Sequence, residues 1–459
     1  MTTEALSRAD MTWLHAETPT NHFVVTSLAI LDAPPSIERL KVMLGHRLAL
    51  QPRLTDVVAE PNLPLSSTRW VPAKDFDLDA HIHSVALPRP AGKQQLADFI
   101  GDLAGQPLDF DRPLWQLYAV EGPGDQGALV GRFHHALGDG QAMVRLLLAL
   151  ADETPDGWKR RPRQPRGAHA RDGRSAITKL LDSMPAPLEM ARTAVDGALT
   201  LARLTLLDPD RPTPLRGQLG MLKAVSWTEP IPLRSVKEVA EVSGTTVNDV
   251  VVSSVAGALG AYLRHAGVDV RGLRIRAMVP VNLRPADDSS MKGNRFSLVY
   301  LEMPVGVADP WERLMRVRIE MDRIKASLEP GAGWLLVQGL GFLPVPLEHI
   351  ASSFYAAKAS LVLTNVIGPR QPLYMAGSRL RQMTFWEPES GGLGVGVSIY
   401  SYAGEVTVGV ISDRNLVEKP QLLTAEVMRA FGDLESVARG LTLSPNAKRA
   451  RSHRRTPNS

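Results

Sequence analysis

The fold and the chemistry of this chain are decided at one short stretch, His134-His135-Ala136-Leu137-Gly138-Asp139-Gly140. An apolar run at residues 128–133 precedes it and is typical of a β-strand, and residues 141–150 carry apolar side chains at helical spacing. The stretch therefore lies where a strand passes into a helix. Because side chains alternate faces along a strand, we expect His134 and His135 to point in opposite directions, one imidazole facing a cavity and the other held inside the protein.

Paired histidines have two other interpretations. A metal site built from both histidines and Asp139 is disfavoured, because adjacent strand residues rarely reach one ion together, and no metal is expected. A pair of core histidines without chemistry is the simpler interpretation of a bare His-His. The following Asp139-Gly140 and the matches elsewhere in the chain favour a catalytic site instead.

The form HHxxxDG resembles the active-site signature of CoA-dependent acyltransferases, which include condensation domains, choline/carnitine acyltransferases and bacterial wax ester synthase/diacylglycerol acyltransferases. Further segments are similar to motifs of the last group and follow in the same order between residues 107 and 370. These segments are Pro113-Leu114-Trp115, Asn248-Asp249-Val250-Val251 and residues 279–284, 293–296 and 364–369, with weaker matches at 76–79 and 401–404. The chain departs from the family pattern at residues 21–24 and at Ile367, which leaves the preferred acceptor open.

The periodicity predicts an α/β chain of the α+β type. Strands are expected at residues 23–31, 117–120, 128–133, 275–281, 296–303 and 361–365. The resemblance implies two chloramphenicol-acetyltransferase-like domains with an active-site tunnel between them. We place an N-terminal acyltransferase domain at 1–153, a basic linker with an amphipathic helix at 154–212, a C-terminal acyltransferase domain at 213–442 and a basic disordered tail at 443–459.

Composition narrows the function further. At 459 residues the chain is too long for one ordinary core, and its lack of cysteine excludes a thiol nucleophile, disulfides and thiolate metal sites. The net charge of +4 comes from two basic runs, 159–174 and 448–455, because the rest of the chain is net negative. This pattern argues against nucleic-acid binding. The basic runs are either solvated segments or contacts with an anionic membrane or lipid droplet surface.

Three further patterns bear on location and on rival sites. Residues 1–10 lack the features of a signal peptide and no uncharged apolar run of 18 residues occurs, so we expect a cytoplasmic protein, soluble or peripheral on the inner membrane or on lipid inclusions. The GxGxxG match at 122–127 joins two strand-like runs and is expected to be a turn. His81 and His83 are expected at the surface, and no GxSxG elbow is present.

The resemblance also implies residue roles. His135 is the general base and His134 supports it, while Asp139 turns away from the substrate and pairs with an arginine, for which Arg284 is the candidate. Gly140 is expected to allow a close backbone approach or an unusual φ. Without a cysteine or a serine elbow, direct transfer in a ternary complex is expected in place of an acyl-enzyme.

Two motifs keep a structural alternative. Asn248 either donates a hydrogen bond to the developing oxyanion or caps the helix that begins at Asp249-Val250. Pro113-Leu114-Trp115 is interpreted as a packed turn near the tunnel. Asp249 is expected to support the site structurally.

The resulting hypothesis is an O-acyltransferase that moves a long acyl chain from acyl-CoA to a fatty alcohol, to diacylglycerol or to both, making wax esters or triacylglycerol. Acyl-CoA is its substrate and no cofactor is expected. The alternatives are a condensation-type acyltransferase that uses a carrier-protein thioester, and a non-catalytic lipid-binding relative.

Overall fold

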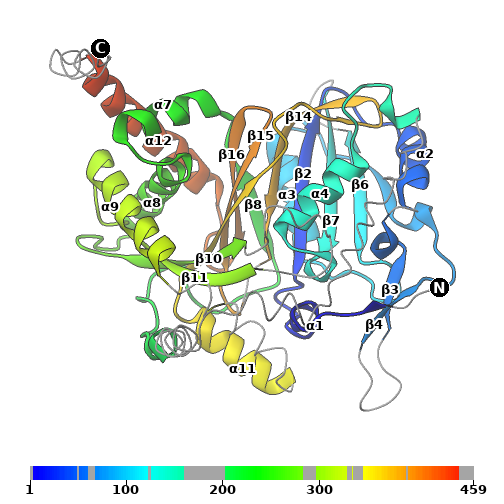
Figure 1. The fold of residues 1–459 in the computed structure, drawn as a ribbon, viewed down its shortest axis with the longest axis horizontal. Helices are drawn as coiled ribbons and strands as arrows, with labels where there is room; N and C mark the ends of the chain where they lie inside the picture. Colours follow the sequence, from blue (N-terminus) through cyan, green and yellow to red (C-terminus); the bar gives the residue numbers. More distant parts are fainter. Residues whose placement is uncertain are drawn as a thin grey trace, which may run out of the picture.

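Two β-sheets stand side by side in the middle of the molecule, with helices packed on their outer sides (Figure 1). This arrangement is seen in a computed structural model. It describes residues 4–48, 51–59, 68–121, 126–159, 202–282, 296–327, 333, 345–388 and 391–443.

The first sheet carries the histidine stretch and lies between two helices. Its strand order is β13 (Tyr374–Met375), β14 (Ser378–Trp386), β2 (Val24–Leu31), β7 (Gly127–His134), β6 (Trp115–Glu121) and β5 (Ile82–Ala86). Alternating residues of β7 face opposite sides, as the pleat requires: Ala128 and Val130 pack toward α3 (Lys93–Ala104), and Leu129 packs toward α4 (Gly140–Leu150). Helix α2 (Ile37–Arg47) lies at the outer edge (Figure 1).

The second sheet belongs to the other half of the chain. Its order is β11 (Phe296–Met303), β10 (Ile275–Asn282), β12 (Leu361–Ile367), β15 (Val395–Tyr402), β16 (Glu405–Asp413) and β8 (Lys223–Trp227), with β9 (Ile231–Pro232) also paired to β16. Its outer side is covered by α7 (Leu233–Ser243), α8 (Val247–His265), α9 (Pro310–Ala326) and α12 (Gln421–Leu443) (Figure 1). Among these helices α8 is buried along most of its length, which suits its run of valine and alanine.

Two further helices and a small sheet lie outside these layers. Helices α1 (Arg8–His15) and α11 (Val345–Ala356) lie below the two large sheets in Figure 1. The small sheet joins β1 (Glu4–Ala5), β4 (Arg69–Pro72) and β3 (Asp56–Ala59).

The expected strands are confirmed as β2, β6, β7, β10, β11 and β12, and the expected helix after the histidines is α4. The GxGxxG segment joins the antiparallel strands β6 and β7, where Glu121 pairs with Gly127, although residues 122–125 themselves lie outside the described chain.

One strand pairing is not anticipated by the expected domain boundaries. Strands β13 and β14 come from residues 374–386, which we assigned to the C-terminal domain, yet they extend the first sheet. Strand β14 pairs antiparallel with β2, with Trp386 opposite Thr26 and Leu380 opposite Leu31. The second half of the chain therefore completes the sheet of the first half.

Several sequence predictions fall on residues outside the described chain. These are most of the expected linker and its helix (160–201), Arg284, and the basic tail from residue 444 onward. In the part that the structure describes, no single helix is both long and apolar enough to cross a bilayer. Helices α7 and α8 would be long and apolar enough only if taken together, and they meet at a bend of 98°.

Gly101 of α3 allows the two halves to pack closely. A Cβ atom on Gly101 would lie 2.7 Å from the backbone oxygen of Lys223 in β8, closer than side-chain carbons come to backbone oxygens. That stretch of backbone is itself anchored, because the buried Nζ of Lys223 lies 2.9 Å from Oδ2 of buried Asp413. Helix α3 can approach the second sheet because residue 101 has no side chain.

We predict that Gly101→Ala lowers the free energy of unfolding by about 1–3 kcal/mol, because the added methyl group overpacks the contact with β8. The control is Gly45→Ala in α2, where a Cβ meets nothing within 4 Å, so that higher helix propensity stabilises the protein by up to about 1 kcal/mol. Thermal unfolding of both variants measures the difference. A Gly101→Ala protein as stable as the Gly45→Ala protein would contradict this account of the interface.

Candidate active site

The two histidines lie at the end of β7, but only His134 belongs to the strand. His135 begins a short 3-10 helix, η4 (His135–Leu137), which leads into α4. The expectation of two neighbouring strand residues is therefore wrong in detail. The turn still separates the rings: the backbone N–H of His134 donates to Leu114 and that of His135 donates to Phe23, and each ring meets a different carboxylate.

His134 is held on both ring nitrogens. Its Nδ1 accepts the backbone N–H of Ala136 at 3.1 Å, so this network assigns the ring proton to Nε2, which donates to Oε1 of Glu17 at 3.2 Å. The side chain has no exposed surface. Burial lowers the pKa of His134, and Glu17 opposes that effect without reversing it. His134 is therefore a neutral, internally satisfied imidazole.

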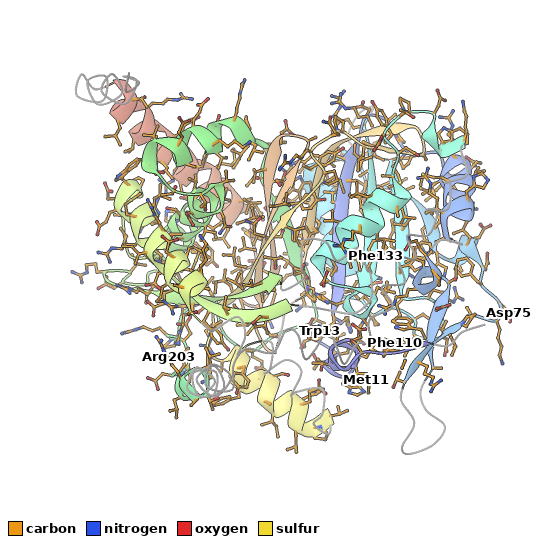
Figure 2. All side chains as sticks on the ribbon, viewed as in Figure 1. Met11, Trp13, Asp75, Phe110, Phe133 and Arg203 are labelled. Carbon is orange, nitrogen blue, oxygen red and sulfur yellow. The ribbon has the colours of Figure 1, made fainter. Side chains whose placement is uncertain are left out.

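His135 faces a cavity instead. Its Nε2 lies 3.4 Å from Oε2 of Glu387, and its side chain is 12% exposed. The ring packs against the indole of Trp13 with centroids 4.8 Å apart. Figure 2 labels Trp13 on α1, below the first sheet, and Phe110 close by, where its ring lies 5.7 Å from that of His134.

The charges around His135 outweigh its burial. Burial by itself lowers the pKa of this imidazole, but contact with Glu387 and its negative charge, followed by the charge of Asp139, raise it further than burial lowers it. The pKa of His135 is therefore raised above its ordinary value, opposite to that of His134. Two adjacent histidines with oppositely shifted pKa values are suited to different roles.

The cavity at His135, called here the His135 cavity, lies between the two halves of the chain and encloses about 790 Å³ with its mouth. Residues from both halves line it: Trp13, Phe23, His135, Asp139, Gly140, Met278, Pro280, Leu298, Val362, Thr364, Asn365, Val366, Glu387 and Pro388. This location agrees with the tunnel implied by the resemblance.

Two larger cavities adjoin it. The first, called here the apolar cavity, encloses about 950 Å³ between α4 and the first sheet and shares Gly140, Val366 and Glu387 with the His135 cavity. Its walls are mainly leucine, valine, methionine and phenylalanine, among them Phe133, which Figure 2 labels. The second, called here the outer cavity, encloses about 1410 Å³, has hydroxyl and amide side chains in its walls, and shares Trp13 and Phe23 with the His135 cavity.

Asp139 and Gly140 form the start of α4. The carboxylate of Asp139 is buried and accepts the backbone N–H of Ala142 at 2.9 Å, which makes Asp139 the N-cap of the helix. Gly140 has no positive φ, and a Cβ there would lie 3.1 Å from Cγ2 of Val366. Of the two reasons expected for Gly140, the close approach is therefore the one the structure supports.

Asn248 does not cap its helix. Thr246 is the N-cap of α8, and Thr246 and Asp249 bond each other's backbone N–H groups as a capping box. Asn248 instead accepts a 2.5 Å hydrogen bond from Nδ2 of Asn365, a residue of the His135 cavity. Asn248 thus contacts the site through Asn365, while buried Asp249 supports the helix.

The segment Pro113-Leu114-Trp115 is packed beneath the histidines, as expected. Leu114 and Trp115 are buried, and the indole N–H of Trp115 donates to the carbonyl of Leu54 at 2.7 Å. His81 stacks on Trp115, with ring centroids 4.5 Å apart, and is 3% exposed. The expectation of a surface position is therefore wrong for His81, because the aromatic neighbour that buries it is distant in sequence.

Three important site residues carry no local sequence signal. Glu17 and Glu387 are single acids in otherwise ordinary segments: Glu17 lies just after α1, and Glu387 follows β14, whose pairing with β2 brings it to the histidines. Phe23 has a φ of +46°, an uncommon conformation for a bulky residue, and its carbonyl accepts the N–H of His135. The pairing of Asp139 with Arg284 stays a prediction, because residue 284 lies outside the described chain.

Comparison with known proteins adds independent evidence. The sequence profile of the wax ester synthase/diacylglycerol acyltransferase catalytic domain matches residues 6–251, and the profile of the C-terminal domain of the same family matches residues 292–435. A Mycobacterium tuberculosis protein named as a diacylglycerol O-acyltransferase is 30% identical over 439 residues, which cover 90% of this chain and 86% of that protein.

Solved structures show the same fold. A wax ester synthase/diacylglycerol acyltransferase from Marinobacter aquaeolei VT8 superposes with a TM-score of 0.68 at 22% identity, covering 95% of this chain and 99% of that chain. The first condensation domain of the calcium-dependent antibiotic synthetase superposes with a TM-score of 0.62 at 17% identity, covering 95% and 96%. At these identities the likeness concerns the fold alone, and it supports the expected two-domain architecture.

The cap at α4 gives a prediction. Asp139→Asn and Asp139→Ala both remove the negative charge, but asparagine keeps a side-chain oxygen that can cap the helix and alanine does not. We expect the alanine variant to be less stable than the asparagine variant by roughly 1 kcal/mol in thermal or denaturant unfolding. Equal stabilities would show that Asp139 does not stabilise the protein as a helix cap.

Proposed function

The chain belongs to the wax ester synthase/diacylglycerol acyltransferase family, and we propose that it transfers a long acyl chain from acyl-CoA to the hydroxyl group of a fatty alcohol, a diacylglycerol or both. His135 is the general base. One observation carries this proposal: His135 lines a cavity between the two halves, whereas both ring nitrogens of His134 are engaged inside the protein.

The reaction needs a base because an alcohol attacks a thioester poorly. Nε2 of neutral His135 takes the proton as the hydroxyl oxygen bonds to the thioester carbonyl carbon. The C–S bond then breaks, and the leaving thiolate takes the proton from the imidazolium to give free CoA. The chain has neither a cysteine nor a GxSxG elbow, so the proposed transfer is direct, with both substrates held together.

Residues around His135 hold it in place. Asp139 caps α4 and so orients the turn that carries His135, and the resemblance gives it Arg284 as partner. Asn248 acts through Asn365, whose side chain lies in the His135 cavity. Trp13 covers one face of the imidazole. None of these residues is required to exchange a proton.

The apolar cavity is suited to the acyl chain. It begins at Gly140, beside the base, and continues along α4 to Leu150, a helix length of roughly 16 Å. Burying an alkyl chain there stabilises the complex by about 0.8 kcal/mol per methylene group. The outer cavity, with its more polar walls, is assigned to the entry of the polar parts of the substrates. Contact with an anionic lipid surface through the basic runs is part of the same proposal.

Substitution of each histidine tests which of the two is the general base. We predict that His135→Asn lowers turnover by roughly 10²- to 10⁴-fold, whereas His134→Asn costs less. The assay measures CoA release from palmitoyl-CoA with hexadecanol and with dioleoylglycerol in parallel, and circular dichroism confirms that both variants fold. Equal losses, or a larger loss for His134→Asn, would move the base to His134. No release by the parent protein with either acceptor would favour a carrier-protein thioester donor or a binding function.

A second exchange tests the acyl cavity. Leu147 lines the apolar cavity two turns into α4, so Leu147→Trp should block long chains and lower kcat/KM for palmitoyl-CoA at least tenfold relative to octanoyl-CoA. Leu148→Trp is the matched control, because Leu148 is 49% exposed on the same helix. If Leu147→Trp changed the preference among alcohols and not among acyl-CoAs, the cavity would hold the acceptor chain.

A further inference from the structure

Glu387 is an acid beside His135 that lies in none of the sequence motifs described above. It directly follows the last residue of β14, and its Oε2 lies 3.4 Å from Nε2 of His135. Its side chain is only 11% exposed. Strand β14 comes from the second half of the chain but pairs with β2 of the first sheet. This pairing brings the carboxylate of Glu387 to His135.

The position of Glu387 is also the meeting point of two cavities. Glu387, Gly140 and Val366 line both the His135 cavity and the apolar cavity. A substrate whose alkyl chain occupies the apolar cavity therefore passes this carboxylate where its reacting carbonyl meets His135. Burying a carboxylate in such an apolar place costs free energy unless the charge is paired. The ion-pair partner of Glu387 there is His135.

The groups that face the imidazole come from four elements. Glu387 follows β14, and Asp139 precedes α4. His134 lies at the end of β7, with its Nε2 bonded to Glu17. Trp13 of α1 contributes an uncharged ring. The carboxylates of Glu387 and Asp139 favour the protonated form of His135, whereas burial favours its neutral form.

We propose that Glu387 is a positioning residue at the junction of the two cavities, whose carboxylate accepts the N–H formed on Nε2 of His135 when that atom takes the substrate proton and so stabilises the imidazolium formed during acyl transfer. This inference rests on the proposed function. In the step it supports, the acceptor O–H bond breaks and the N–H bond forms at His135, then the leaving thiolate takes that proton. Glu387 keeps its charge throughout and neither gains nor loses a proton.

The proposal has a consequence for pH dependence. The base must be neutral to accept a proton, so kcat/KM falls as the pH drops below the pKa of His135 in the free enzyme. Since Glu387 raises that pKa, removing its charge should allow His135 to stay neutral at lower pH. Removing the charge of Glu387 also removes the partner of the imidazolium, so the maximal rate should fall. The acidic limb of the pH profile should shift to lower pH.

The test is the pH profile of kcat/KM for Glu387→Gln, Glu387→Asp and the parent protein, with palmitoyl-CoA and the better acceptor. We expect Glu387→Gln to move the acidic limb down by about one pH unit or more and to lower kcat at the plateau roughly tenfold. Glu387→Asp, which keeps the charge, should retain a limb closer to that of the parent. Glu229→Gln is the control, because the side chain of Glu229 is 72% exposed in a surface pair with Lys93.

Each outcome decides one of the two proposals. A folded Glu387→Gln protein whose acidic limb coincides with that of the parent would overturn the role of Glu387, even if its rate were lower. Full activity of His135→Asn would instead overturn the proposed base. If Glu387→Gln failed to fold, the comparison of Glu387→Asp with the parent would decide, because a shorter carboxylate that left both the limb and the plateau rate unchanged would contradict a positioning role.

Discussion

The antiparallel pairing of β14 with β2 is the interaction on which the rest of the site depends. Strand β2 pairs with β14 on one side and with β7 on the other, so one end of this sheet brings together Glu387, Phe23 and the two histidines. Main-chain hydrogen bonds set the register, and a slip of one residue would turn every side chain of β14 to the opposite face. The pairing of β14 with β2 thus both joins the halves of the molecule and places Glu387 beside His135.

The two adjacent histidines are of the same residue type but have different surroundings. His134 satisfies Ala136 and Glu17 with its two nitrogens and stiffens the end of β7. His135, one residue further on, is turned by η4 toward the cavity. The first imidazole stiffens the backbone that carries the second one, and only the second one lines the cavity.

The cavities around His135 relate the chemistry to lipid substrates. The apolar cavity beside α4 and the more polar outer cavity each adjoin the His135 cavity, which residues from both halves line. Because His135 belongs to the first half and Glu387 to the second, the electrostatic environment of His135 exists only when the halves are correctly assembled. Close packing of α3 on β8 through Gly101 contributes to that assembly.

The sequence by itself determined the elements whose signals are local. The strands and the helix around residues 127–150 follow from hydrophobic period, and the ordered motifs indicate the family and predict His135 as the base. Only the tertiary structure decided that Glu17 and Glu387 meet the histidines, that Thr246 caps α8 in place of Asn248, and that His81 is buried. The reason is physical. A period of two or of 3.6 residues records which face of an element is apolar, whereas contacts between residues 135 and 387 depend on which strands pair, and no local pattern specifies that choice.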